Sequence, residues 1–404
     1  MVPLTTGFTQ ENELHPAAKS LLIELFDKGF RDPSKVHRAS RELSILVNKA
    51  KTTFAENLDA DISQIEFLGE PDLGFQIGIE GMVAGSRGES SDFNKLKRLK
   101  IAHSQIDRQP IHAIGRALAK TNNQVEILPV EENGRIKLSN FEPDILIWQV
   151  ANGETGNIQN EPKSAARLFL DCTTSGVDVS KPKNGDVALF DSTAWAGPAG
   201  LGVLVIKKPE SWKYPLAHID AIRTPRTFSI PLMIASAVAL ENYRQELSST
   251  SLKAKQQSEK LVSLLKNEIK DLICASDLEN RQFKYLSLII PNIDGEQLKN
   301  ELAEMAIDID SGSACKSADL RPSHVLAAMG LPTSGNIRIT FKSSHTEKDL
   351  ENLLYVTDIR YRFVGKDYFE KDFTGKSICE HLGIEIIYLP RNHSWSSSEL
   401  RNRI

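Results

Sequence analysis

Ser311-Gly312-Ser313-Ala314-Cys315-Lys316-Ser317-Ala318 places one cysteine among small residues. The glycine and serines around Cys315 favour a loop over a packed helix or strand, and Pro322 then suits the start of a helix. The cation of Lys316 favours the thiolate form of the cysteine. A lone cysteine is more often a small buried apolar residue. In this setting we instead predict an exposed loop whose thiol acts as a nucleophile or a sulfur carrier.

The residues after this loop extend the pattern. Pro322-Ser323-His324-Val325-Leu326 runs on to Gly330, and Ile337-Arg338-Ile339-Thr340-Phe341 follows. Together with the cysteine loop, these segments resemble the C-terminal part of the cysteine desulfurases, which are pyridoxal phosphate enzymes of the class V aminotransferase group and of fold type I. The resemblance implies that Cys315 attacks the sulfur of L-cysteine and leaves as a persulfide. It also implies that Arg338 holds the substrate carboxylate.

Length and composition agree with a large enzyme. A chain of 404 residues exceeds what one hydrophobic core usually serves, so we expect two domains and accessory elements. The net charge of -4 gives no sign of nucleic-acid binding. Residues 1–20 lack the apolar core of a signal peptide, and no apolar run approaches about 18 residues. We therefore expect no membrane segment and a cytoplasmic location.

The cysteines are scattered, so neither a zinc site nor a disulfide framework is expected, and we predict no metal. They are Cys172, Cys274, Cys315 and Cys379.

From Arg98 onward, strand-like and helix-like stretches alternate. This alternation predicts a mostly parallel sheet covered by helices, with ligands beyond the carboxyl ends of its strands. With the resemblance, it predicts a three-layer α/β large domain of the fold type I pyridoxal phosphate transferases and a smaller α+β domain. The stretches are Leu99–Ile101, Pro110–Ala119, Val125–Leu128, Ile145–Val150, Arg167–Leu170, Val187–Phe190 and Leu201–Ile206.

The resemblance also divides the chain. Residues 1–230 are expected to form the large domain, with an N-terminal lead that packs on the small domain. Residues 231–355 form the small domain that carries the cysteine loop, and 356–404 form a tail. A long helical region, about Leu232 to Leu272, is predicted to be interrupted near Ser248-Ser249-Thr250. Homodimers are typical of the desulfurases, so we expect one here.

Two strand ends resemble the ring side of the desulfurase cofactor site. Val150–Gly156 resembles the asparagine-rich turn beside the ring, and Leu170–Thr174 resembles an Asp-Ala-Thr-Gln strand end. The resemblance implies that Asn152 lies beside the ring. It implies that Asp171 pairs with the protonated pyridine nitrogen, which lets the ring act as an electron sink.

The segment Phe190–Gly202 resembles Ser-Gly-His-Lys-x-x-Gly-Pro-Lys-Gly-x-Gly, whose first lysine forms the Schiff base with pyridoxal phosphate. At that position this chain has Ala194, and Thr193 replaces the histidine. A methyl group cannot form an imine or move the α-proton of the substrate.

Other positions of the pocket also depart from the family. Thr174 replaces a glutamine that contacts the ring, and either Arg108 or Gln109 falls where a histidine stacks on it. Glu70-Pro71 replaces an Ala-Thr pair at the helix start that holds the phosphate. Its carboxylate and that of Asp72 would repel a dianion, and proline removes a donor.

Downstream, Arg226-Thr227-Phe228-Ser229-Ile230-Pro231 resembles a loop that reaches the phosphate of the neighbouring subunit, and Ser229 keeps a hydroxyl there. The resemblance thus leaves two catalytic residues, Cys315 and Arg338. The predicted cofactor-binding residues are Asn152, Asp171, Thr174, Thr193 and Ser229.

The tail carries a different pattern. Arg360–Tyr368, Gly383–Arg391 and Ser396–Arg401 resemble the C-terminal strand-helix-strand-helix of glycerol-phosphate-type cytidylyltransferases. The His-x-Gly-His motif of that family is absent from the chain, so nucleotidyl transfer by this polypeptide is not expected. A partial tail of this kind indicates a fusion remnant or an interaction element.

Three functions remain open from the sequence. The first is a cysteine desulfurase-like enzyme that passes sulfur from L-cysteine through Cys315 to an acceptor protein. Such an enzyme would be impaired by Ala194 and would bind pyridoxal phosphate non-covalently, if it binds this cofactor at all. The second is an inactive dimeric paralogue that serves as a scaffold or regulator. The third is a persulfide carrier that needs no cofactor.

Overall fold

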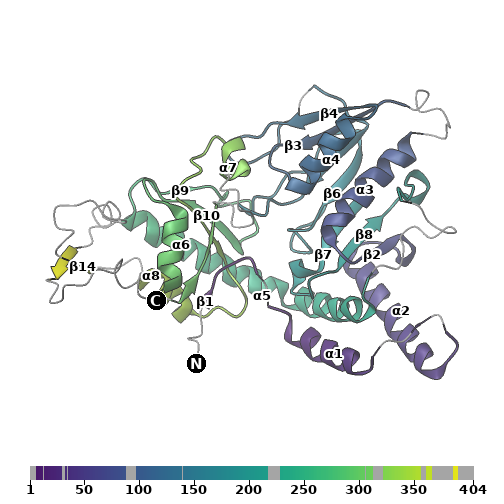
Figure 1. Ribbon diagram of the computed structural model, residues 1–404, viewed down its shortest axis with the longest axis horizontal. Coiled ribbons are helices and arrows are strands. Elements are labelled where there is room, and N and C mark those ends of the chain that lie inside the picture. The colour runs from purple at the N-terminus through teal and green to yellow at the C-terminus, as the bar shows by residue number, and fades with distance from the viewer. Residues whose placement is uncertain are drawn as a thin grey trace, which may run out of the picture.

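The computed structural model has a larger part, built on a seven-stranded sheet, and a smaller part, built on a four-stranded sheet (Figure 1). Cys315 and the tail motif at Ser396–Arg401 lie outside the described residues. The structure describes residues 6–11, 13–29, 32–33, 35–87, 97–138, 140–216, 228–304, 306–312, 322–355, 361–365 and 385–389.

The larger sheet confirms the predicted α/β fold with a mostly parallel sheet. Its strands lie in the order β2-β8-β7-β6-β5-β3-β4, and β8 alone runs against the other strands of this sheet. Parallel neighbours need crossover connections, which place helices on the faces of the sheet. The strands are β2 (Ile65–Leu68), β3 (Leu99–Ser104), β4 (Asn123–Leu128), β5 (Ile145–Gln149), β6 (Arg167–Asp171), β7 (Gly185–Asp191) and β8 (Gly202–Ile206).

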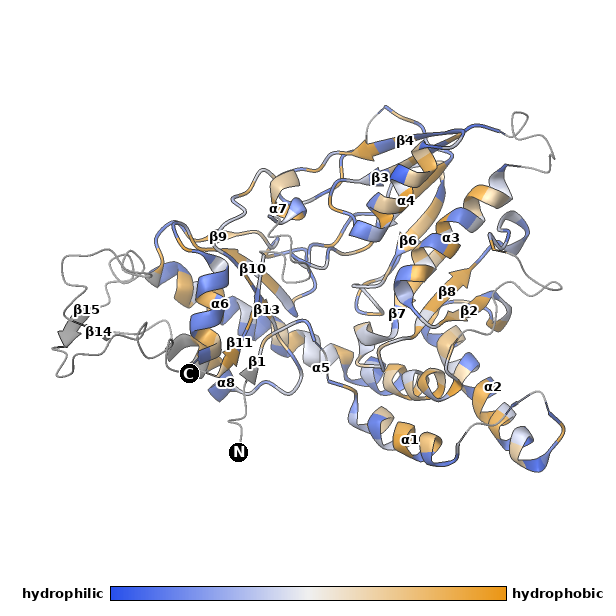
Figure 2. Ribbon diagram, viewed as in Figure 1, coloured by the Kyte–Doolittle hydropathy of each residue, from blue (hydrophilic) through white to orange (hydrophobic). Residues whose placement is uncertain are grey.

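Both faces of this sheet are buried, because alternate side chains of its strands enter different cores. In β5, Ile145 and Ile147 pack with α3 and α4, whereas Leu146 and Trp148 pack with α1, α2 and α5. The strands are accordingly apolar along most of their length (Figure 2). The covering helices are α1 (Pro16–Asp27), α2 (Arg38–Leu58), α3 (Pro71–Ser86), α4 (Gln109–Ala119) and α5 (Ile230–Glu268).

The smaller part is an antiparallel sheet in the order β12-β13-β10-β9. The N-terminal lead joins it, because β1 (Thr6–Gly7) pairs with β11 (Ile307–Asp308) and Phe8 is fully buried in its core. The other elements are β9 (Ile273–Cys274), β10 (Tyr285–Ile289), β12 (Asp310–Ser311), β13 (Asn336–Thr340), α6 (Gly295–Glu304), α7 (His324–Ala328) and α8 (Glu347–Tyr355). The assignment of 1–230, 231–355 and 356–404 to separate domains stays a prediction.

Helix α5 passes from one part to the other without a break, so the predicted interruption at Ser248-Ser249-Thr250 is wrong. The hydroxyl groups of Ser249 and Thr250 donate to the carbonyl oxygen of Glu246, at 2.8 and 3.1 Å. These hydroxyl groups therefore have partners within the helix, and the helix continues through them. The helix also ends at Glu268, before the predicted Leu272.

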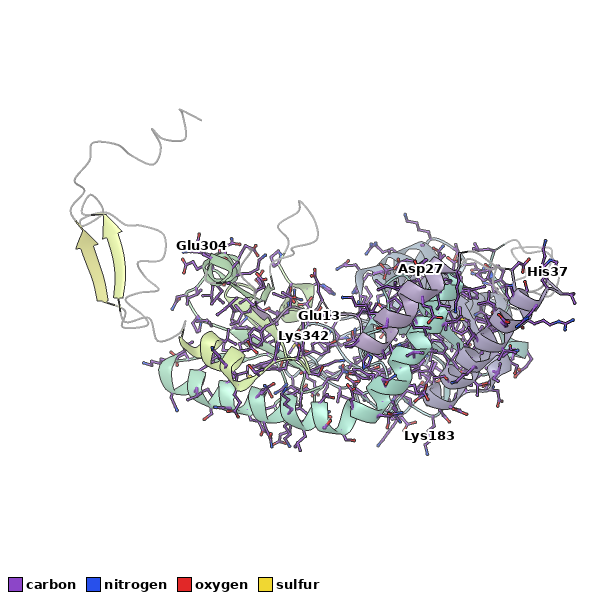
Figure 3. The ribbon with its side chains drawn as sticks, turned by 90° about the horizontal axis from the view of Figure 1, so that it is seen from below. Glu13, Asp27, His37, Lys183, Glu304 and Lys342 are labelled. Carbon is purple, nitrogen blue, oxygen red and sulfur yellow. The ribbon has the colours of Figure 1, made fainter. Side chains whose placement is uncertain are left out.

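In the tail, β14 (Tyr361–Gly365) and β15 (Glu385–Leu389) form a parallel pair (Figure 3). The resemblance of this tail to cytidylyltransferases stays a prediction.

Among the helices that the structure describes, none combines the length and apolar character that a bilayer span requires. The short 3₁₀ helices outside the candidate site are η1 (Ile62–Gln64) and η4 (Pro209–Ser211).

A buried histidine lies where α4 packs on β3. A Cβ atom at Gly115 would lie 2.6 Å from Nε2 of His103, so glycine leaves the room that this ring occupies. The ring is 1% exposed, and its Nδ1 lies 3.2 Å from the carbonyl oxygen of Ser104. Burial, with a smaller contribution from His112, lowers the pKa of His103 from 6.5 to about 4.

We expect His103 to make the fold sensitive to mild acid. Below about pH 6.5, His103 is protonated in the unfolded chain but stays neutral in the folded chain. The free energy of unfolding therefore falls as the pH drops from about 6.5 to about 4. His103→Asn keeps a donor for Ser104 without this titration. Between pH 7 and about pH 5, this variant should lose about 2 kcal/mol less unfolding free energy than the wild type, measured by denaturant titration. The exposed His37→Asn variant should follow the wild type, and equal losses in all three proteins would contradict the assignment.

Candidate functional site

The candidate site lies at the carboxyl ends of β5, β6 and β7, the edge at which open parallel sheets bind ligands. Asn152 follows β5, Asp171 is the last residue of β6, and Ala194 follows β7 in the short 3₁₀ helix η3 (Ser192–Trp195). Because the three strands are neighbours, these residues share one edge of the sheet.

Asp171 is buried and faces an arginine. Its Oδ1 accepts hydrogen bonds from the backbone and hydroxyl groups of Thr173, at 2.9 and 2.6 Å. Its Oδ2 has no hydrogen-bond partner among the described residues and lies 3.6 Å from Nε of Arg108. Nη2 of Arg108 donates to Oγ1 of Thr174 at 2.6 Å. Of the two residues that the sequence left open, Arg108 is therefore the one that reaches Asp171 and Thr174, whereas Gln109 contacts His324.

Asn152 shapes the turn after β5. Its Oδ1 accepts from the backbone N–H groups of Glu154 and Thr155, at 2.9 and 3.0 Å. Its Nδ2 donates to the carbonyl oxygen of Ile106 and to Oε1 of Gln149. With its side chain engaged on both ends and 2% exposed, Asn152 acts here as a positioning residue for the turn.

Ala194 is buried in a well-anchored turn. Trp195 donates from Nε1 to Oγ of Ser236 on α5 at 3.0 Å, and Ser192 shares a 2.6 Å hydrogen bond with the same hydroxyl. Ala194 is 5% exposed, and a Cβ atom at Gly176 would lie only 2.9 Å from its methyl group. The backbone of this turn, which the resemblance matches to the lysine turn of the family, is thus fixed, and the side chain at position 194 is a methyl group.

Three described lysines could be considered as replacements. Nζ of Lys284 lies 3.4 Å from the carbonyl oxygen of Ala194, but it also pairs with Asp178 at 2.7 Å. Burial alone would lower the pKa of Lys284, but Asp178 and neighbouring tyrosines outweigh it and raise the pKa well above its ordinary value. An ammonium held in this way is not a nucleophile. Lys181 donates to the carbonyl oxygen of Leu58, and Lys183 lies at the outer surface (Figure 3).

The corner where the resemblance expects a phosphate carries negative charge. Glu70 precedes α3, Pro71 is the first residue of that helix, and Asp72 lies in its first turn. Burial raises the pKa of Asp191, hydrogen bonds from Thr193 and the charge of Arg108 lower it, and Asp72 raises it. The predicted site residue Thr193 is therefore bonded to a carboxylate that sequence analysis missed, although its position at a strand end was a signal.

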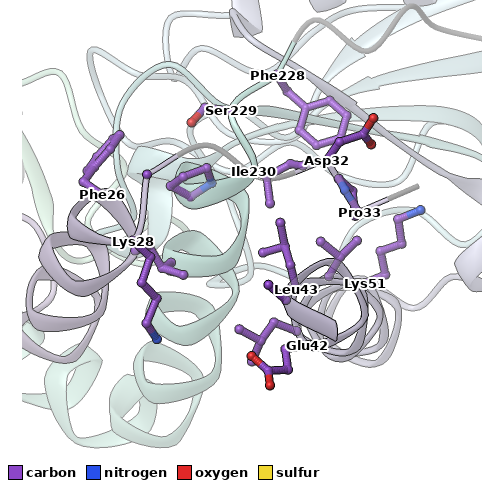
Figure 4. A pocket seen from close by; sticks show the side chains of 16 residues that line it. Phe26, Lys28, Asp32, Pro33, Glu42, Leu43, Lys51, Phe228, Ser229 and Ile230 are labelled. Atoms are coloured by element: carbon purple, nitrogen blue, oxygen red, sulfur yellow. The ribbon is translucent and has the colours of Figure 1, made fainter. Parts of the chain in front are cut away.

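Ser229 lies on the wall of a cavity of about 770 Å³ that the residues above do not line (Figure 4). The cavity is lined by α1, α2, the loop between them and the start of α5, with Phe26, Leu43 and Ile230 among its apolar residues. Ser229 precedes the first residue of α5, and its carbonyl oxygen accepts from the N–H group of Met233.

Arg338 lies on β13, the strand that pairs with β12. Its Nη2 donates to the carbonyl oxygen of Ser311 at 2.7 Å, and its Nη1 lies 3.9 Å from Oε2 of Glu154. The same Glu154 oxygen accepts from the hydroxyl of Ser323 at 2.6 Å. One network therefore holds the residues on both sides of segment 313–321. Sequence analysis missed Glu154, because a contact between residues so far apart leaves no local signal.

The helix after the loop begins later than predicted. Ser323 caps α7, since its Oγ accepts from the N–H group of Leu326 at 3.2 Å, and His324 is the first helical residue. Pro322 precedes the cap and does not start the helix.

These residues do not fit pyridoxal phosphate as the resemblance expects it to be held. Ala194 offers no amine, and the helix start to which the resemblance assigns the phosphate carries Glu70 and Asp72 and has a proline as its first residue. Arg108 lies beside the oxygen of Asp171 that a protonated pyridine nitrogen would need. Among the described residues, no group of three histidine, cysteine or acidic side chains is arranged to bind a metal ion.

Comparison with solved structures supports the fold. The structure is similar to a NifS-like protein, with a TM-score of 0.76, 21% identity and coverage of 87% of this chain and 98% of that one. It is also similar to a cysteine desulfurase from Thermococcus onnurineus, with a TM-score of 0.71, 16% identity and coverage of 88% and 94%.

Comparison of sequences supports the family. The family model for class V aminotransferases matches residues 24–353. The chain is 23% identical over 376 residues to the cysteine desulfurase IscS of Dictyoglomus turgidum, covering 88% of this chain and 91% of that protein. It is 25% identical over 371 residues to a cysteine desulfurase of Gluconacetobacter diazotrophicus, covering 84% and 89%. Members of this family depend on pyridoxal phosphate, which is therefore the cofactor that membership implies. With a matched fold and a family model that spans most of its length, the chain belongs to the class V aminotransferase family.

Proposed function

We propose that this chain is a cysteine desulfurase-like protein that keeps the sulfur-handling loop of Cys315 and has lost efficient release of sulfur from L-cysteine. The observation that carries the proposal is Ala194, a buried methyl group on an intact, anchored turn. Loss of a lysine that forms a covalent bond with its cofactor and moves a proton removes a contribution of about 10²–10⁴-fold from the proton transfer alone. We place the protein in the cytoplasm.

The network around the cysteine loop supports a second candidate, a persulfide carrier. Arg338, Glu154 and Ser323 hold both flanks of segment 313–321 through contacts that need no cofactor. The thiolate of Cys315 would attack the outer sulfur of a donor protein's persulfide, form a new S–S bond and release the donor thiolate. A later attack by an acceptor thiolate on the outer sulfur would return Cys315 to a thiolate.

A homodimer is part of the proposal, and the apolar surface of α1 and α2 supports it. Ile23 and Phe26 on α1 are 57% and 58% exposed, and Ile45 on α2 is 67% exposed. These side chains come from the two helices that line the cavity at Ser229 (Figure 4). Exposed apolar side chains on two helices that line the same cavity favour a protein interface there.

We expect no lysine adduct in the wild-type protein. After incubation with pyridoxal phosphate and reduction with borohydride, mass spectrometry of peptides should find no modified lysine in the pocket, and sulfide release from L-cysteine should be about 10²–10⁴-fold below that of an active family member. Ala194→Lys is the matched variant, and we expect only partial cofactor loading because Glu70 and Arg108 remain. An adduct on a pocket lysine of the wild type would refute the loss of the covalent bond.

Transfer of labelled persulfide sulfur from a donor protein should separate carrier from scaffold. The carrier function predicts label on the wild type and its loss in Cys315→Ala, with Cys172→Ala as control because Cys172 is buried and burial raises its pKa to about 12. Equal labelling of the wild type and Cys315→Ala would eliminate the carrier. Without any labelling or sulfide release, a dimeric scaffold or regulator would remain.

We expect Ile45→Glu to weaken the dimer. A carboxylate in an apolar interface loses its hydration, so the dimer dissociation constant should rise at least about tenfold, or about 1.4 kcal/mol, as measured by analytical ultracentrifugation. Leu252→Glu is the control, because Leu252 is similarly exposed, at 57%, but lies on α5 and not on α1 or α2. An unchanged dissociation constant for Ile45→Glu would place the interface elsewhere.

A further inference from the structure

The backbone of Arg108 is held in a fixed position beside the candidate site. The turn before it is held by Asp107, which is fully buried and whose Oδ2 accepts from the N–H group of Ser104 at 2.6 Å. Arg108 then caps α4 in an extended conformation, with φ -62° and ψ 150°. The guanidinium group therefore starts from a rigid turn and reaches the ends of β5 and β6.

Two contacts hold the guanidinium group there. Nη2 donates to Thr174 at 2.6 Å, and Nε lies 3.6 Å from Oδ2 of Asp171. Gly153 leaves the space for this arrangement, because a Cβ atom at that position would lie 3.1 Å from Oγ1 of Thr174 and 3.6 Å from Nη2 of Arg108. Thr174 accepts this hydrogen bond through a hydroxyl group on a short side chain. A larger side chain at position 174 would displace this contact.

The charge of Asp171 explains why an arginine at this position matters. A carboxylate that is 2% exposed requires a nearby positive charge or must become protonated. Among the described residues, Arg108 is the cation within 4.0 Å of it. A bound pyridinium would supply the same charge to the same oxygen, so the guanidinium and the cofactor ring compete for one partner.

We infer that Arg108 is the internal counter-ion of Asp171 and excludes the pyridine ring of pyridoxal phosphate from the pocket. The inference deepens the proposed function, on which it rests: the missing lysine removes the covalent bond, and Arg108 removes the non-covalent affinity that would remain. Arg108 and Thr174 then form one coupled replacement of the two ring contacts that the resemblance expects.

The test is non-covalent binding of pyridoxine phosphate, which has the ring and phosphate of the cofactor but no aldehyde, so it cannot form imines with lysines. Equilibrium dialysis should give a dissociation constant at least about tenfold lower for Arg108→Ala than for the wild type. Arg116→Ala, at an exposed arginine of the same helix, should match the wild type. In the Asp171→Asn background, Arg108→Ala should bring no gain, which a purely structural role of Arg108 would not predict.

Thermal unfolding provides a second measurement. Arg108→Ala should melt below the wild type without ligand and recover on addition of pyridoxine phosphate, because the ring replaces the lost charge beside Asp171. If Arg108→Ala does not fold, Arg108→His and Thr174→Val serve instead, and both should bind more tightly than the wild type. Equal affinity of the wild type and the folded Arg108 variants would overturn the inference. That result would leave the missing covalent bond untouched, whereas a borohydride-fixed pocket lysine in the wild type would refute the proposed function itself.

Discussion

Burial of the larger sheet on both faces is the constraint on which the rest of the molecule depends. Alternate side chains of β5 enter cores on opposite sides, so neither face has room for a polar site. Polar side chains can gather only where the strands end, and there the chain places Asp171 and the turn that carries Ala194. The geometry of the family survives because it follows from apolar packing, which the substitutions at the site do not disturb.

The features of the site fall into two groups, those that hold the backbone in place and those that the resemblance assigns to a cofactor. Features that hold backbone in place remain, such as the bonds of Trp195 and Ser192 to α5 and those of Asn152 within its turn. The positions to which the resemblance assigns contacts with a cofactor differ from the family pattern, at Ala194 and beside Asp171. A scaffold role and a carrier role both need the first set alone, whereas the desulfurase reaction needs both.

Much of the fold could be predicted from the sequence, because strands buried on both faces read as continuous apolar runs with turn residues between them. The interruption predicted in α5 failed for a specific reason: serine and threonine favour caps and turns on average, yet Ser249 and Thr250 bond back into their own helix. At the site, motif matches located Asp171 and Ala194, but they left Arg108 and Gln109 undecided. Which side chain reaches Asp171 depends on the turn at Asp107, and that is a property of three-dimensional structure.

The continuity of α5 has a mechanical consequence. At about 1.5 Å per residue, its 39 residues extend for about 58 Å. One end contributes Met233 and Leu240 to the core of the larger sheet, and the other contributes Leu261 and Leu265 to the core of the smaller one. Because one continuous helix packs into both cores, the unfolding of the two cores is coupled. Partial unfolding of the smaller sheet would therefore also destabilise α5. The position of Arg338 on β13 relative to Glu154 is therefore fixed for as long as α5 is intact.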